Sequence, residues 1–157
     1  MKRPVLQFRC SAALHGGVMT RVMATGTFDI LHPGHLLYLE RSRALGDELV
    51  VVVARDANVR HKPKPVIPED QRLRMVSALK MVDMAVLGSR TDIFEPVRDL
   101  RPDIITLGYD QYMDESWLKE ELRRRGLHAR VVRISERETC ELCSSRQIVE
   151  KILKERC

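Results

Sequence analysis

Two histidines three residues apart are the clearest chemical signal in this sequence. His32 and His35 belong to the segment Thr25-Gly-Thr-Phe-Asp-Ile-Leu-His-Pro-Gly-His35, between an apolar run and a stretch with helical spacing. Pro33 suits the first turn of a helix, because its missing N–H would have no partner there. Residues three apart share one side of a helix. Two imidazoles and several free backbone N–H groups would then converge where the helix dipole favours an anion, which predicts a phosphate site.

The same histidine pair could instead be half of a metal site. Zinc would need a third and a fourth ligand, and the surrounding sequence has neither an H-E-x-x-H nor a nearby C-x2-C pattern. We therefore favour phosphate binding for His32 and His35.

Alternating strand and helix patterns must position these histidines. Short apolar runs bounded by turn residues predict strands at 21–25, 48–54, 82–87, 103–107 and 129–134. Helical spacing predicts helices at 33–45, 69–80, 93–100 and 116–125, and a last helix that buries Ile148, Val149, Ile152 and Leu153. This alternation predicts an α/β fold with a parallel sheet and right-handed crossovers.

Polar loops follow the expected strands, at the edge where open α/β sheets bind ligands. Lys62 and Lys64 follow the second strand and could reach phosphates as mobile charges, although a solvated linker would look the same. Asp110 lies in the exit turn of the fourth strand. Ser144 and Ser145 are natural N-caps for the last helix.

Composition favours a small anionic ligand over nucleic acid. The net charge is 27 − 22 = +5, but aromatic residues make up only 4% and the basic residues are interspersed with acidic ones. No run approaches the roughly 20 apolar residues of a membrane helix. The 157 residues suit one domain, which we place at 20–157. Residues 1–19 are interpreted as a leader without a role, either disordered or the product of a mis-set start.

The cysteines favour a reducing, cytoplasmic location. Cys10 lies in the leader and Cys157 is the last residue, so a disulfide framework is not expected. Cys140 and Cys143 form one C-x2-C, which is half of a zinc site or a redox pair. We favour two reduced thiols at a helix N-terminus, where thiols are sensitive to oxidation.

Three segments together resemble a known family. Gly26-Thr-Phe-Asp29 followed by His32-Pro-Gly-His35 resembles the HxGH signature of the nucleotidyltransferase superfamily. Gly108-Tyr-Asp-Gln111, and Cys143 before two serines, resemble archaeal FAD synthases more than glycerol-phosphate cytidylyltransferases. The resemblance implies a Rossmann-like five-stranded parallel sheet in the order 3-2-1-4-5, with helices on both faces.

The activity implied by the resemblance is adenylyl transfer from ATP to FMN, giving FAD and pyrophosphate. One alternative is a cytidylyltransferase that acts on a polyol phosphate such as glycerol 3-phosphate. Another is a regulatory nucleotide- or RNA-binding module without turnover, for which two imidazoles would not be needed. The resemblance also implies a homodimer without a bound organic cofactor, with flavin as substrate and product. The composition argues against nucleic acid and membrane as partners.

Residue roles follow from the resemblance in the same way. His32, His35 and Lys62 would be catalytic. ATP would be bound by Thr27, Phe28, His32, Pro33, Gly34, His35, Lys64, Asp110, Arg137, Ser144 and Ser145. A divalent cation, Mg²⁺ with Mn²⁺ or Co²⁺ as alternatives, would bridge the phosphates. Asp29 could hold that cation through water or could cap the turn.

Overall fold

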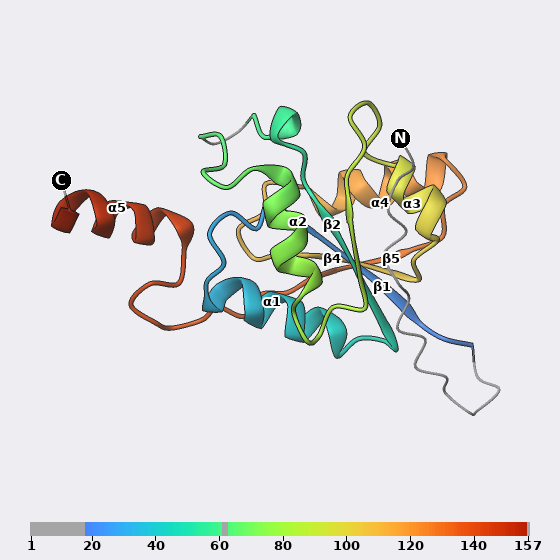
Figure 1. Cartoon of the computed structure of the whole chain (residues 1–157). Coiled ribbons are helices and arrows are strands. Elements are labelled where there is room, and N and C mark those ends of the chain that lie inside the picture. Colours follow the sequence, from blue (N-terminus) through green and yellow to red (C-terminus); the bar gives the residue numbers. More distant parts are fainter. Residues whose placement is uncertain (1–17, 61–62, 157) are drawn as a thin grey trace.

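Five parallel strands form the centre of the protein (Figure 1). The computed structural model describes residues 18–60 and 63–156. The strands are β1 (Arg21–Gly26), β2 (Glu48–Val53), β3 (Met84–Leu87), β4 (Ile104–Leu107) and β5 (Arg130–Arg133). Their order is β3-β2-β1-β4-β5, and all neighbours are parallel. The predicted fold class and strand order are confirmed.

The central strands are continuously apolar, which suits strands whose two faces are both covered by helices. Every residue from Leu49 to Val53 in β2 is buried, as expected for a strand inside a parallel sheet. Gly26 pairs with Val53, so β1 and β2 end level with each other. The turns after these two strands therefore begin at the same edge of the sheet.

Helices cover both faces of the sheet. Four helices do so: α1 (Pro33–Arg43), α2 (Glu69–Ser77), α3 (Glu95–Leu100) and α4 (Glu115–Arg124). A fifth helix, α5 (Ser145–Arg156), and a 3₁₀ turn at Asp56–Asn58 complete the helical elements of the described residues. Leu39 of α1 and Val76 of α2 belong to the core on one face. Val97 of α3 and Leu118 of α4 belong to the core on the other. Figure 1 shows the two pairs of helices on either side of the strands.

Buried hydroxyl groups fix α1 to the sheet. The Tyr38 hydroxyl donates to the carbonyl oxygen of Thr106 at 2.9 Å, and the hydroxyls of Ser42 and Thr106 lie 2.8 Å apart. Burial raises the pKa of Tyr38 to about 12, so this phenol stays protonated and keeps its donor. The start of α1 is thereby held at a constant place relative to β1 and β4.

The last helix departs from the prediction. The expected burial of Ile148, Val149, Ile152 and Leu153 is wrong: no residue of α5 is buried, and Ile152 and Leu153 are 50% and 58% exposed. In Figure 1, α5 stands apart from the sheet and its helices. Apolar spacing predicts an amphipathic helix, but it does not determine which surface the helix packs against.

Smaller differences lie at helix ends. The first helix ends at Arg43 where residue 45 was expected, and the second ends at Ser77 where residue 80 was expected. The last turn of a helix often frays or tightens, so its observed end can differ by a few residues from the end that apolar spacing predicts. Residues 1–17 of the expected leader lie outside the described part of the chain. None of the helices that the structure describes is long and apolar enough to cross a membrane.

Candidate functional site

The turn after β1 is held open by a buried aromatic ring. Phe28 is 3% exposed and lies against Gly26, where an added Cβ would come within 2.7 Å of the ring. Phe28 and Ile30 have positive φ angles of 55° and 49°, which bulky residues rarely adopt. Such strain is typical of functional turns. Because the Phe28 side chain lies in the core, only its backbone is available to ATP, to which it was assigned.

The two histidines converge at the start of α1 as predicted. His32 precedes the helix in an extended conformation, and His35 lies in its first turn. Their ring centroids are 3.7 Å apart with an interplanar angle of 25°. The His35 ring also contacts Phe28 edge-on at 5.3 Å. The side of His35 that faces the core is therefore supported by packing.

Burial sets the protonation state of His32. Desolvation lowers the pKa of His32 below 6.5, and the negative charge of Asp110 partly opposes this. Within the described residues, the buried Nδ1 atom of His32 has no hydrogen-bond partner. His32 is therefore neutral at pH 7 and offers a ring N–H to a phosphate. Asp110 is thus close enough to His32 to influence its charge, and the assignment of both residues to ATP stays a prediction.

A second helix N-terminus meets the start of α1. A Cβ on Gly34 would lie 2.7 Å from the carbonyl oxygen of Cys143, so the two segments touch where only glycine fits. The Ser145 hydroxyl donates to the carbonyl oxygen of Asp29. Ser144 caps α5 by accepting from the backbone N–H of Gln147 at 3.2 Å. Two helix dipoles thus point their positive ends at one region, which favours a polyanion.

The cysteines beside this junction are paired in the structure. Cys140 and Cys143 form a disulfide, whereas two reduced thiols were expected. Their spacing of three residues brings the two Cα atoms to 5.5 Å, within the range that a disulfide spans. This is the redox pair that the C-x2-C spacing also allowed, and which state the two sulfurs take in the working protein stays a prediction. Whether oxidation changes activity stays a prediction.

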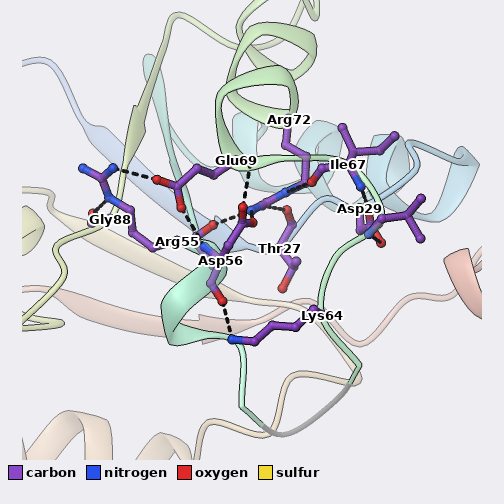
Figure 2. A network of polar contacts seen from close by, with 11 residues as sticks. Thr27, Asp29, Arg55, Asp56, Lys64, Ile67, Glu69, Arg72 and Gly88 are labelled. Carbon is purple, nitrogen blue, oxygen red and sulfur yellow. Dashed lines mark hydrogen bonds and ion pairs between the residues drawn. The ribbon is translucent and has the colours of Figure 1, made fainter.

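Arg72 is a structural residue whose position sequence patterns did not reveal. It is 1% exposed, and its guanidinium donates to the carbonyl oxygens of Thr27, Ala54 and Ile67 and pairs with Asp56 (Figure 2). These partners come from the turns after β1 and β2 and from the segment before α2. One buried side chain therefore fixes three loops at the carboxyl edge of the sheet.

Two residues assigned to phosphate or metal contribute to the same scaffold. Both carboxylate oxygens of Asp29 accept backbone N–H groups at 2.9 Å, from Val66 and Ile67 (Figure 2). Asp29 is thus a turn anchor, and its other expected role, holding a cation through water, stays a prediction. The Lys64 ammonium donates to the carbonyl oxygen of Asp56 at 2.7 Å. Lys62 lies outside the described residues.

No protein cage for a metal ion is present in the described chain. Across residues 18–60 and 63–156, no three side chains of His, Cys, Asp or Glu gather closely enough to hold a metal ion. Metal ligation by the histidine pair would need further ligands from elsewhere. The donors at this edge of the sheet suit phosphate oxygens better.

The exit turn of β4 is clamped by a second arginine that the site prediction missed. Arg133 donates to the carbonyl oxygens of Gly108 at 2.8 Å and Met113 at 2.6 Å. Gln111 donates to the carbonyl oxygen of Thr25 and so joins this turn to β1. The Arg137 guanidinium lies 4.4 Å from the ring centroid of Tyr109. Asp110 therefore lies in a turn held by several hydrogen bonds, and Arg137 packs against the same turn through Tyr109. Both residues were assigned to ATP.

A cavity of about 620 Å³ opens beside this turn at the carboxyl edge of the sheet. Thr27 and Asp110 lie on its wall, which links it to the histidine pair. Its other walls come from β1, β2, β4, α3 and the start of α4. The volume is within the range of small-molecule sites, about 300 to 1,000 Å³.

Comparison with known proteins points to the same chemistry. Residues 23–151 match the family model described as cytidylyltransferase-like. A relative named FAD synthase from Methanothrix thermoacetophila is 91% identical over 90% of this chain and 99% of its own length. Another FAD synthase, from Archaeoglobus profundus, is 64% identical over 86% of this chain and 87% of its own.

A solved structure is similar as well. The protein from Thermoplasma volcanium, named a lipopolysaccharide core biosynthesis protein, is 51% identical, with a TM-score of 0.74 over 77% of this chain and 100% of its own.

Proposed function

The chain belongs to the archaeal FAD synthases of the cytidylyltransferase-like family, and we propose that it transfers the adenylyl group of ATP to FMN, giving FAD and pyrophosphate. The observation that carries this proposal is the match to relatives named FAD synthases over most of the chain. The match disfavours cytidylyl transfer to a polyol phosphate such as glycerol 3-phosphate.

The reaction needs no general base on the protein. The second pKa of a phosphate monoester is about 6, so the phosphate of FMN is largely dianionic at pH 7. One of its oxygens attacks the α-phosphorus of ATP and forms a new P–O bond. The bond between the α-phosphorus and the bridging oxygen to the β-phosphorus breaks, and its electron pair leaves with pyrophosphate. The protein aligns the two phosphates and stabilises the charge that develops.

The residues at the start of α1 are suited to this task. His32 and His35 donate ring N–H groups to the α-phosphate and to the leaving oxygen. The N-termini of α1 and α5, which meet between Gly34 and Cys143, bind the pyrophosphate portion. Because the histidines are positioned by Phe28 and by the core before any ligand binds, little reorganisation is needed during the reaction.

A divalent cation is part of the proposal but not of the protein scaffold. Each oxygen of the Asp29 carboxylate already accepts a backbone N–H group, so phosphate oxygens would be the direct ligands of the cation and Asp29 would act at most through water. When bound with the nucleotide, Mg²⁺, Mn²⁺ or Co²⁺ would neutralise phosphate charge. We also propose that the protein is a cytoplasmic homodimer that does not bind nucleic acid.

The test is an assay for FAD by liquid chromatography, with ATP, FMN and Mg²⁺. A parallel reaction contains CTP and glycerol 3-phosphate. We expect FAD only with ATP and FMN, and a rate at least about a hundredfold lower in His35→Ala, since one lost phosphate donor has an effect of that order. Pyrophosphate release from CTP with glycerol 3-phosphate, without FAD formation in the first reaction, would reverse the assignment.

A further inference from the structure

The cavity beside the histidine pair has a deep apolar wall that phosphate transfer alone does not require. This wall consists of Met23, Val52, Phe94, Val97, Ile105 and Leu107. Five of these six side chains are at most 5% exposed, and Val52 is 8% exposed, so the wall is the core surface of the sheet under α3 and α4. A ligand that fills the cavity therefore contacts a packed apolar surface.

The rim of the cavity is also apolar on one side. Ile93, two residues before the first residue of α3, lines the cavity and is 53% exposed. Tyr112, which follows the exit turn of β4, also lines the cavity and is 87% exposed. A flat ring system in contact with both would remove apolar surface from water at both positions, which favours binding.

The opposite end of the cavity is polar and adjoins the phosphate site. Thr25, Gly26 and Thr27 line this end, and Asp110 lies within electrostatic range of His32. The cavity thus has an apolar depth and a polar end next to the histidines. A small acceptor such as glycerol 3-phosphate has no apolar part for that depth.

The direction of approach separates the acceptor from the nucleotide. In-line displacement places the attacking oxygen and the leaving pyrophosphate on opposite sides of the α-phosphorus. The pyrophosphate portion belongs at the start of α1, which covers one face of the sheet. The cavity lies towards the other face, under α3 and α4. The acceptor can therefore enter from the cavity and meet the nucleotide beside Thr27.

We propose that this cavity binds the isoalloxazine ring of FMN, with the ribityl phosphate directed towards Thr27 and His32. The dimethylbenzene edge of the ring lies against the apolar wall, and the polar pyrimidine edge faces the opening. The inference rests on FMN being the acceptor in the proposed function. It adds the place where the ring is bound and the residues that recognise it.

The test compares two exposed apolar residues of similar exposure. Ile93→Gln removes an apolar contact from the rim of the cavity. Met75→Gln is the matched control, because Met75 lies on α2, is 55% exposed and does not line the cavity. We expect Ile93→Gln to raise the KM for FMN about fivefold, as for loss of part of one buried aliphatic side chain, and to leave the KM for ATP unchanged. Met75→Gln changes neither. An unchanged KM for FMN in Ile93→Gln would overturn the proposal.

A binding measurement separates the site from the reaction. Riboflavin has the isoalloxazine ring without the phosphate, and its fluorescence should be quenched on titration with the wild-type protein, more weakly with Ile93→Gln. Failure of the wild-type protein to make FAD would refute the proposed function, while this titration would still support or refute the ring site. FAD formation together with no riboflavin binding at millimolar protein concentration would refute the ring site alone.

Discussion

At the scale of single residues, the site depends on side chains that are fixed before a ligand arrives. His32 is held at the start of α1, and burial keeps its imidazole neutral at pH 7. Asp110 opposes the effect of burial on the pKa of His32, so the two groups are electrostatically coupled. The Arg72 guanidinium donates to three carbonyl oxygens at once, so it holds the loops that carry them in one arrangement.

The protonation of His32 should appear in the pH dependence of stability. Its pKa in the folded protein lies below 6.5, so as the pH falls below about 6.5 the unfolded chain takes up a proton that the folded chain does not. This lowers the free energy of unfolding. We expect that free energy to fall less between about pH 7.5 and pH 5.5 in His32→Asn than in the wild type, measured by urea denaturation. If the free energy of unfolding falls equally in the wild type and in His32→Asn, the lowered pKa of His32 is contradicted.

Replacing Arg72 should destabilise the protein. Arg72→Met leaves three partly buried carbonyl oxygens without their donor, and each such loss costs about 1 kcal/mol, so we expect about 3 kcal/mol. Arg72→Lys should not restore stability, since one ammonium cannot match the geometry of a guanidinium.

Arg74→Met provides the control for this measurement. Arg74 lies on the same helix but is exposed, and its replacement should change the urea midpoint little. Similar midpoints for Arg72→Met and Arg74→Met would show that the Arg72 network does not stabilise the fold.

At the scale of elements, the phosphate site depends on the junction between α1 and α5. Gly34 lets the backbone near Cys143 approach the first turn of α1, and Ser145 bonds to the carbonyl oxygen of Asp29. The rest of α5 makes no buried contact, so the position of its N-terminus depends on these few interactions. A change in the 140–145 segment should therefore affect phosphate binding.

Oxidation or reduction of Cys140 and Cys143 would change the 140–145 segment in this way. A disulfide restrains the four residues immediately before Ser144 and Ser145, so we expect slower FAD formation after oxidation with diamide than after reduction with dithiothreitol. Cys140→Ser removes the pair and should make the rate the same under both conditions. A difference between oxidised and reduced protein that persists in Cys140→Ser would place the sensitivity elsewhere.

At the scale of the whole molecule, a doubly wound sheet brings distant segments to one edge. The turn after β1, the loop before α2, the exit turn of β4 and the start of α5 all meet at the carboxyl ends of the strands. Parallel strands end together, so the site follows from the topology. The exposed apolar side chains of α5, Ile152 and Leu153, are not accounted for by this chain alone.

The homodimer proposal is tested by mass. Sedimentation or light scattering should give twice the 18.1 kDa of one chain. The salt dependence should be weak if apolar surface such as that of Ile152 lies in the contact, because screening acts on charges. A measured mass of one chain, about 18.1 kDa, at the protein concentration of the activity assay would contradict the dimer.

Local patterns in the sequence determined most of the fold and the position of the histidine pair. The order of strands and helices, the turn at Gly26 and the pair at the start of α1 depend on contacts within a few residues, which spacing rules describe. Lys62 stays a prediction because it lies outside the described residues.

Only the tertiary structure decided which distant residues the site uses. Arg72 contacts Thr27 across 45 positions, and the cavity combines side chains from five elements, so no local pattern reveals them. The role of Asp29 as an anchor and the exposure of α5 were decided in the same way. Hydrophobic spacing shows that a surface is apolar, but the partner that covers it depends on the packing of the whole chain.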